Sequence, residues 1–374
     1  MLCVLLHSIK ILCFILLVTI SNKSFSNEKA VTVSIIVNEI FDNEIKYEFY
    51  GLASYYNDLK YYLVSDKEIK KLESNSNFIL QKEEWLAIVL RNKVVIIKNY
   101  NLNIQILNNK LNFHKDAANN KITLKEISKI EFEEMFNKKY FLRYINLPSP
   151  LAWLAIQIEN ILSVTYEFVF KSWGLSIIFL AFVMRIILFP VTLLTIKQQY
   201  KVSITQSQLE PKLIEIKKNY DGEEAHNLIM QAHKDEGVTP FYSIKPLLFT
   251  LIQIPFLIVI FNVLGEMSSL SGQSFLWITD LSLPDNIGML PISIPLFGNV
   301  ISLLPIVMLL LGLIFAYLLK NNVVNEEILR KKKINLYLMA ICFFILFYPF
   351  PSSMLLYWIA AMLLQFMQER IVKV

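Results

Sequence analysis

The last long segment of the chain, residues 334–368, contains no charged side chain. Residues 246–264 and 286–319 are also free of Asp, Glu, Lys and Arg. About 20 apolar residues in a helix span the hydrocarbon core of a bilayer. The chain is 18% charged and 55% hydrophobic, whereas soluble domains carry about 25% charged residues. These runs exclude a single soluble enzyme domain and predict a mainly α-helical membrane protein.

Proline residues divide the apolar runs into predicted spans. Pro349 and Pro351 place a tight turn at residues 348–353, between two short spans. Residues 286–319 are too long and too rich in proline for one helix, so residues 286–300 are expected to form a re-entrant or surface loop. We predict five spans, covering residues 173–194, 246–264, 301–319 and the two halves of residues 334–368.

The distribution of Lys and Arg between the loops predicts how these spans are oriented. Residues 197–245 contain seven Lys, and residues 320–333 contain four Lys and one Arg. Residues 265–300 contain neither. We therefore place the first two segments and the C-terminus in the cytoplasm, and residues 265–300 outside together with residues 27–146.

The N-terminal part is predicted to be exported. Residues 1–26 have the pattern of a signal peptide, and an uncleaved signal anchor is the alternative. Residues 27–146 are expected to form a small β-rich domain, because short apolar runs alternate with Asn, Asp and Lys clusters. No Cys lies in this segment, which excludes a disulfide framework there. The predicted strands are residues 31–37, 47–50, 61–64, 85–90, 94–97 and 104–107.

The exported segment shows no catalytic constellation. His114 is its only histidine and is predicted to lie in a surface loop. Residues 125–140 are expected to be helical and to lead toward the membrane. Residues 147–172 are apolar but carry Glu159, Glu167 and Lys171, which predicts an amphipathic helix lying at the membrane interface.

Residues 197–240 are predicted to form a cytoplasmic hairpin of two amphipathic helices, with a turn at Asp221 and Gly222. His226 and His233 lie on the second helix, but no third ligand is nearby, so no metal site is predicted. The predicted seam between the two helices consists of Leu209, Leu213, Ile216, Tyr220, Ala225, Leu228 and Ala232.

Arg185 lies near the middle of the first predicted span, where a charge costs about 3 kcal/mol or more. The predicted spans contain no Asp or Glu that could pair with it. Arg185 is therefore expected to face a wet polar cavity; the alternative is an arginine satisfied by backbone carbonyls in a packed bundle. Four other polar side chains could line the cavity or form hydrogen bonds between helices, namely Thr192, Gln253, Asn262 and Gln365.

A series of short motifs follows in order along the second half of the chain: W-G-L-S-I-I at 173–178, R-I-I-L-F-P-V-T at 185–192, K-Q-Q at 197–199, L-E-P-K-L at 209–213, H-K-D-E-G-V at 233–238, Q-I-P-F at 253–256, F-L-W-I-T-D-L-S at 275–282 and P-S-S-M-L-L-Y-W at 351–358. In order and spacing, this series resembles the YidC-type membrane protein insertases, which are relatives of the mitochondrial Oxa and chloroplast Albino proteins.

The resemblance implies a five-helix core with a cytoplasmic hairpin and a hydrophilic groove that opens to the cytoplasm and to lipid. Arg185 stands at the place of an arginine in that groove. With it, we expect the polar side chains of Gln253, Thr192 and Gln365 to line the substrate groove. Trp358, with Tyr357 beside it, falls where the family has an aromatic residue facing the substrate path.

Some positions depart from the family pattern. Ala181 stands where the family often has a polar residue one turn before the arginine. Residues 239–240 and 242–243 are Thr-Pro and Tyr-Ser in place of Asn-Pro and Gly-Gly features. The stretch from residue 246 to residue 253 is longer than the common spacing, which leaves open the face that Gln253 presents. The exported segment is far shorter than the large β-domain usual in Gram-negative members.

The resemblance implies a membrane protein insertase and chaperone that carries out no chemical step and needs no cofactor. Its implied partners are nascent membrane proteins, membrane lipids, the Sec translocon and the ribosome. The net charge of +5 does not support nucleic-acid binding. A transporter or channel would need mid-membrane carboxylates or inverted repeats, and none is visible. A scaffold for assembling membrane complexes stays open as an alternative. An intramembrane protease would need an Asp pair or a Ser/His dyad, and the predicted spans contain neither.

Overall fold

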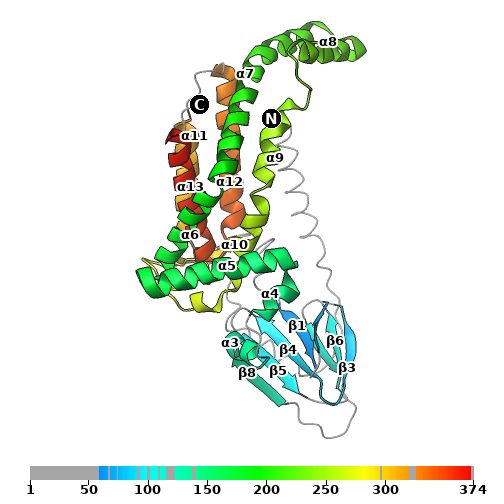
Figure 1. Cartoon of the computed structure of the whole chain (residues 1–374), viewed down its shortest axis with the longest axis vertical. Coiled ribbons are helices and arrows are strands. Elements are labelled where there is room, and N and C mark those ends of the chain that lie inside the picture. Colours follow the sequence, from blue (N-terminus) through cyan, green and yellow to red (C-terminus); the bar gives the residue numbers. More distant parts are fainter. Residues whose placement is uncertain are drawn as a thin grey trace.

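The computed structural model describes residues 59–65, 68–73, 75–90, 93–98, 102–107, 110–114, 123–136, 140–294, 297–319 and 326–371. The predicted leader and the predicted strands at residues 31–37 and 47–50 lie outside these ranges. Figure 1 shows a β-rich part at one end of the molecule and a helical part at the other, with helix α5 crossing between them.

The β-rich part consists of two antiparallel sheets. The larger sheet has the strand order β2 (Ile69–Leu72), β1 (Lys60–Val64), β4 (Trp85–Leu90), β5 (Lys93–Lys98) and β8 (Thr123–Ser128). The smaller sheet has the order β3 (Asn77–Leu80), β6 (Leu102–Leu107) and β7 (Lys110–His114). The predicted β-rich domain is therefore present, and its strands include those predicted between residues 61 and 107.

The larger sheet is buried on both faces. On one face Ile88 packs with Ile104 of the smaller sheet. On the other face Ala87 packs with Phe132 and Leu142, which belong to the helices α3 (Lys129–Glu134) and α4 (Phe141–Asn146). A strand covered on both faces needs apolar side chains at successive positions, which explains the apolar sequences of β4 and β5.

Two predictions for this part are wrong. Residues 125–128 form the end of β8, paired with β5, rather than the start of a helix, because sheet pairing overrides local helix preference. Helix α3 begins only after Ser128, whose side chain accepts a hydrogen bond from the N–H of Glu131 at 3.1 Å. His114 ends strand β7 and does not lie in a loop.

A buried cluster of charged side chains joins the β-rich part to the helical part. Glu266, beyond the predicted span at residues 246–264, pairs with Lys60 of β1 and lies 4.0 Å from Lys129 and 3.7 Å from Arg143 of α4. Arg143 also pairs with Glu159 of α5 at 3.0 Å. Burial alone would raise the pKa of Glu266, but the charges of Lys60, Lys129 and Arg143 lower it to about 2. We call these five residues the junction cluster.

The helical part begins with α5 (Ser149–Thr165), which is extended by a π-helical turn, η2 (Tyr166–Phe170). The helices that follow are α6 (Trp173–Ile187), α7 (Phe189–Asn219), α8 (Gly222–Asp235), η3 (Tyr242–Ile244), α9 (Lys245–Leu251), α10 (Ile254–Glu266), η4 (Ser268–Leu270), α11 (Leu303–Tyr317), α12 (Glu326–Phe347) and α13 (Ser352–Ile371). The tight turn predicted at residues 348–353 thus separates α12 from α13.

Two of the predicted spans are broken in the structure. Residues 173–194 are divided at Leu188, where α6 and α7 meet at an angle of 61°. Residues 246–264 are divided between α9 and α10, before Pro255. Proline cannot donate the backbone hydrogen bond of a helix interior but is tolerated in a first turn, and Pro190 and Pro255 both stand there.

Because of these breaks, the individual helices are shorter than the predicted spans. Within the described ranges, no single helix is both long and apolar enough to cross a bilayer, whereas the bent pair of α6 and α7 meets both conditions together. Helices α10 and α11 are apolar but shorter.

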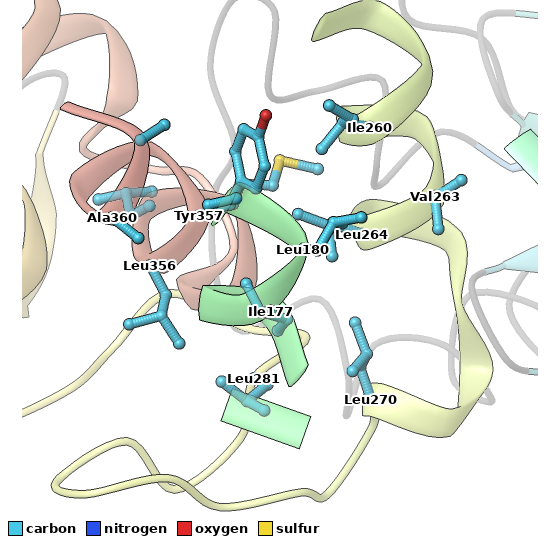
Figure 2. Close-up of a cluster of buried hydrophobic side chains, with 14 of the residues drawn as sticks. Ile177, Leu180, Ile260, Val263, Leu264, Leu270, Leu281, Leu356, Tyr357 and Ala360 are labelled. Atoms are coloured by element: carbon cyan, nitrogen blue, oxygen red, sulfur yellow. The ribbon is translucent and has the colours of Figure 1, made fainter. Parts of the chain in front are cut away.

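The apolar core of the helical part lies near α5. Figure 2 shows Ile177 and Leu180 of α6 between Leu356 and Ala360 of α13 on one side and Val263 and neighbouring residues of α10 on the other. On α13, residues 352–361 are buried apart from Trp358. Beyond this point exposed side chains recur along α13, including those of Leu363, Gln365, Met367 and Glu369. The bundle is therefore tightly packed at the end next to α5 and more open toward α8.

Residues 286–300, predicted as a loop, contain an antiparallel strand pair, β9 (Gly288–Ile294) and β10 (Gly298–Ile301). Asp285 precedes the pair and is 2% exposed. Its carboxylate accepts hydrogen bonds from the N–H groups of Leu303 and Leu304, at 2.7 and 3.0 Å, and so caps α11.

Candidate functional site

Arg185 lies in the last turn of α6, just before the chain bends into α7. Its Nη2 atom donates a hydrogen bond to Oε1 of Gln365 on α13, at 2.9 Å. Nε2 of Gln365 in turn donates to Oε1 of Glu369, also at 2.9 Å. Nε2 of Gln368 donates to the backbone carbonyl of Arg185 at 3.5 Å. These four residues link α6 to α13, and we call them the Arg185 network.

The structure brings Arg185 together with Gln365, one of the side chains predicted to line a polar cavity, and adds a carboxylate that sequence reasoning missed. The predicted spans contain no Asp or Glu because they stop at residue 368, one position before Glu369. Residues four apart on a helix lie on the same face, so the spacing of Gln365 and Glu369 is the signal that points to this carboxylate.

Among the described residues, Gln365 is the one predicted cavity residue that forms a hydrogen bond with Arg185. Thr192 is buried on α7, and its hydroxyl donates to the carbonyl of Leu188 at 3.1 Å. Gln253 is half-buried at the start of α10. Asn262 accepts a hydrogen bond from Arg143 at 2.5 Å, so it belongs beside the junction cluster rather than beside Arg185.

The two predicted aromatic residues have different surroundings. Tyr357 is 6% exposed and near enough to Arg185 for an electrostatic interaction; Figure 2 shows it at the edge of the apolar core, near Leu180. Trp358 packs among aromatic rings, with its centroid 5.1 Å from that of Phe347 and 6.0 Å from that of Phe261. Of the two aromatic residues, Tyr357 is thus the one with an electrostatic interaction with Arg185.

The surroundings of the Arg185 network are apolar and partly open. Ile186 and Ile187 of α6 are 57% and 54% exposed, and Met367 of α13 is 57% exposed. Oε1 of Gln368 is buried and has no hydrogen-bond partner among the described residues. A buried amide oxygen normally accepts a hydrogen bond, so this oxygen is an acceptor that the described side chains leave unsatisfied. The arrangement is suited to holding a polar segment beside apolar surface.

The two histidines of the predicted hairpin have different surroundings. Nδ1 of His233 donates to the carbonyl of Ile229 at 2.7 Å, whereas His226 is exposed. Within the part of the chain that the structure describes, no three His, Cys, Asp or Glu side chains are grouped to hold a metal ion.

The Arg185 network lies within the part of the chain that matches a known protein family. The 60Kd inner membrane protein family matches residues 164–374, more than half of the chain. The matched region includes α6 to α13 and leaves out the β-rich part.

Individual relatives carry the same kind of name. A "Membrane protein insertase YidC" from Treponema denticola is 30% identical over 239 residues, covering 62% of this chain and 40% of that protein. One from Chlamydia trachomatis is 33% identical over 213 residues, covering 54% of this chain and 26% of that protein. The chain therefore spans less than half the length of these relatives.

A solved structure described as an "Active YidC insertase crystal structure with the first transmembrane domain resolved" has a TM-score of 0.40. The two sequences are 17% identical, and the match covers 83% of this chain and 70% of the chain in that structure.

Proposed function

Because this chain belongs to the 60Kd inner membrane protein family, we propose that it is a membrane protein insertase and chaperone of the bacterial inner membrane. The observation that carries the proposal is the position of Arg185, a cation on an apolar helix whose side-chain hydrogen bond goes to a neutral amide. A cation with a neutral partner keeps much of its attraction for an external anion.

In this proposal the two halves of the bundle have different tasks. The packed core next to α5 holds the helices together, whereas the open end toward α8 admits a client segment beside the Arg185 network. Burial of the client's apolar helix in lipid supplies the driving force, about 25 cal/mol per Å². Arg185 and the amides of Gln365 and Gln368 solvate the client's polar flank while it crosses. Gln253, Thr192 and the aromatic residues Tyr357 and Trp358 line the rest of the client's path.

The proposed topology follows from the charges at the ends of the helices. The end toward α8 carries the Lys residues of α7 and α8 and the basic residues at the start of α12, so it is placed in the cytoplasm with the C-terminus. The β-rich part lies outside, and α5 lies along the interface. The proposed divisions are residues 1–26 for the leader, 27–146 for the exported domain, 147–172 for the interfacial helix and 173–374 for a core of five spans.

The proposed partners are nascent membrane proteins and membrane lipids, with the Sec translocon and the ribosome as further partners. Expression in a bacterium depleted of its own insertase tests the function, with insertion of a single-span client read out by protease protection. We expect rescue by this chain. A chain that reaches the membrane at normal levels but inserts no client would instead support the scaffold function, and purified chain in liposomes repeats the measurement without host partners.

A further inference from the structure

Glu369 ends the chain of polar groups that begins at Arg185. An amide has donors on its nitrogen and acceptors on its oxygen. Because the nitrogen of Gln365 donates to Glu369, its oxygen is turned toward Arg185. Arg185, which can only donate, and Glu369, which accepts, therefore hold the Gln365 amide in this orientation together. Its charge also acts on Arg185 directly, through an electrostatic attraction.

Glu369 also interacts electrostatically with a second cation, Lys332 of α12. Lys332 stands where α12 leaves its charged start and becomes apolar. Burial lowers the pKa of Lys332, and the nearby charge of Glu369 opposes this shift. Glu369 therefore acts on two cations, one on α6 and one on α12, and its influence on Arg185 depends on the charge of Lys332.

We propose that Glu369 is a positioning residue that sets the charge preference of the Arg185 site for client segments. It holds the Gln365 amide in the orientation that binds Arg185, and its negative charge offsets part of the attraction of Arg185 for acidic client residues. This inference rests on the proposed insertase function, and it adds a residue that limits how strongly the site favours acidic segments.

The offset has a physical reason. Arg185 attracts a client carboxylate, and only a carboxylate that is held at Arg185 comes close enough to Glu369 on the neighbouring helix to be repelled by it. Charges in partly buried surroundings are screened less than charges in water. A weaker attraction speeds the release of the client segment, because a client that Arg185 binds too tightly dissociates slowly.

The test uses the full chain in the membrane and two clients that differ only in their translocated tails, one acidic and one neutral. The quantity measured is the ratio of acidic-tailed to neutral-tailed insertion. We expect Glu369→Gln, which keeps an acceptor but loses the charge, to raise this ratio about threefold. We expect Lys332→Gln to lower it, because Glu369 then acts on Arg185 alone. Glu134→Gln, at an exposed carboxylate of α3 in the β-rich part, is the matched control and should leave the ratio unchanged.

A double variant separates positioning from a general structural role. If Glu369 acts through Arg185, Glu369→Gln should leave the ratio unchanged once Arg185→Ala is present. An equal loss of both clients in Glu369→Gln, or a ratio that stays the same or falls, would overturn the proposal. So would an undiminished effect in the Arg185→Ala background.

A binding measurement distinguishes failure of this inference from failure of the insertase function. A photo-reactive side chain at Met367, which is exposed on α13, should cross-link the acidic tail more strongly in Glu369→Gln than in the unchanged chain. If cross-linking shows this preference but no client is inserted, the insertase function is wrong and the role of Glu369 stands. If clients are inserted and the preference is absent, the role of Glu369 is wrong.

Discussion

At the scale of single residues, Arg185 combines a permanent charge with a neutral hydrogen-bond partner, Gln365. Arginine and lysine differ here, because lysine keeps the charge on a flexible stem but lacks the planar, five-donor guanidinium. A role as a source of positive field would therefore tolerate lysine, whereas a role that depends on bidentate contact would not.

We expect Arg185→Ala to reduce insertion of an acidic-tailed client about fivefold or more while affecting a short, uncharged-tailed client least. Arg185→Lys should retain most activity, because the field is preserved. Protease protection of the two clients at matched insertase levels is the measurement. Equal insertion of both clients by Arg185→Ala would show that Arg185 is a structural residue of the bundle.

At the scale of elements, the end of α7 together with α8, residues 210–236, forms an arm that has few buried contacts with the rest. Between residues 210 and 236, Ala232 and His233 are the buried side chains. The ion pairs of this stretch are Lys212 with Glu236 at 2.6 Å and Lys331 of α12 with Glu210 at 3.7 Å. Surface ion pairs contribute about 0–1 kcal/mol, so the arm adds little to the stability of the bundle.

We therefore expect a chain in which residues 210–236 are replaced by a short Gly/Ser bridge to accumulate in the membrane at nearly normal levels. Insertion of a single-span client should be slower, because the arm docks partners in the proposed function. Immunoblots of membrane fractions and the rate of protease protection are the two measurements. Disappearance of the protein itself would mean that the arm is structural.

At the scale of the whole molecule, the junction cluster fastens the β-rich part to the helical part. Removal of one partner from a buried ion pair costs about 3–5 kcal/mol, because the other charge is left uncompensated. The carboxylate of Glu266 interacts with Lys60, Lys129 and Arg143, so it is the member whose loss leaves the most positive charge buried.

We expect Glu266→Gln to release the β-rich part from the helices, seen as faster hydrogen exchange in α4 and faster proteolysis between the two parts. A surface change such as Glu223→Gln should alter neither. The pKa of Glu266, about 2, lies below its ordinary value of 4.5, so its contribution is complete above pH 4.5 and is lost as the pH falls through about 2. Exchange in α4 should thus be constant from pH 8 to pH 5, after correction for intrinsic exchange rates; a step near neutral pH would contradict this assignment.

The orientation of the molecule in the membrane gives a further prediction. In a chain lacking Cys3, Cys13 and Cys342, a cysteine at Ser271 should react with an impermeant maleimide added from outside, and a cysteine at Ser207 should not. Ser207 lies on α7 among lysines, whereas Ser271 follows α10 at the end next to α5. Labelling of the cysteine at position 207 from outside would contradict the orientation that the charged loops predict.

Charge and proline distribution along the chain were enough to predict the helical class and the turn between α12 and α13. They also identified Arg185 as a charge within an apolar segment. Short apolar runs separated by polar clusters predicted four of the strands, namely β1, β4, β5 and β6. These features depend on local composition, because burial in a sheet or a bilayer excludes charge from whole segments. Residues 125–128 show the limit of such reasoning, since pairing with β5 decided their conformation.

The partners of the charged residues depended on the tertiary structure. Arg185 and Gln365 are far apart in sequence, as are Lys60 and Glu266, and only the packing of α6 on α13 and of β1 near α10 brings them together. The 61° bend at Leu188 also arises in three dimensions, because Pro190 permits a break there but α7 takes its direction from packing against α9. Local sequence determines which segments can be buried. Long-range packing then determines which charged side chains lie close enough to interact.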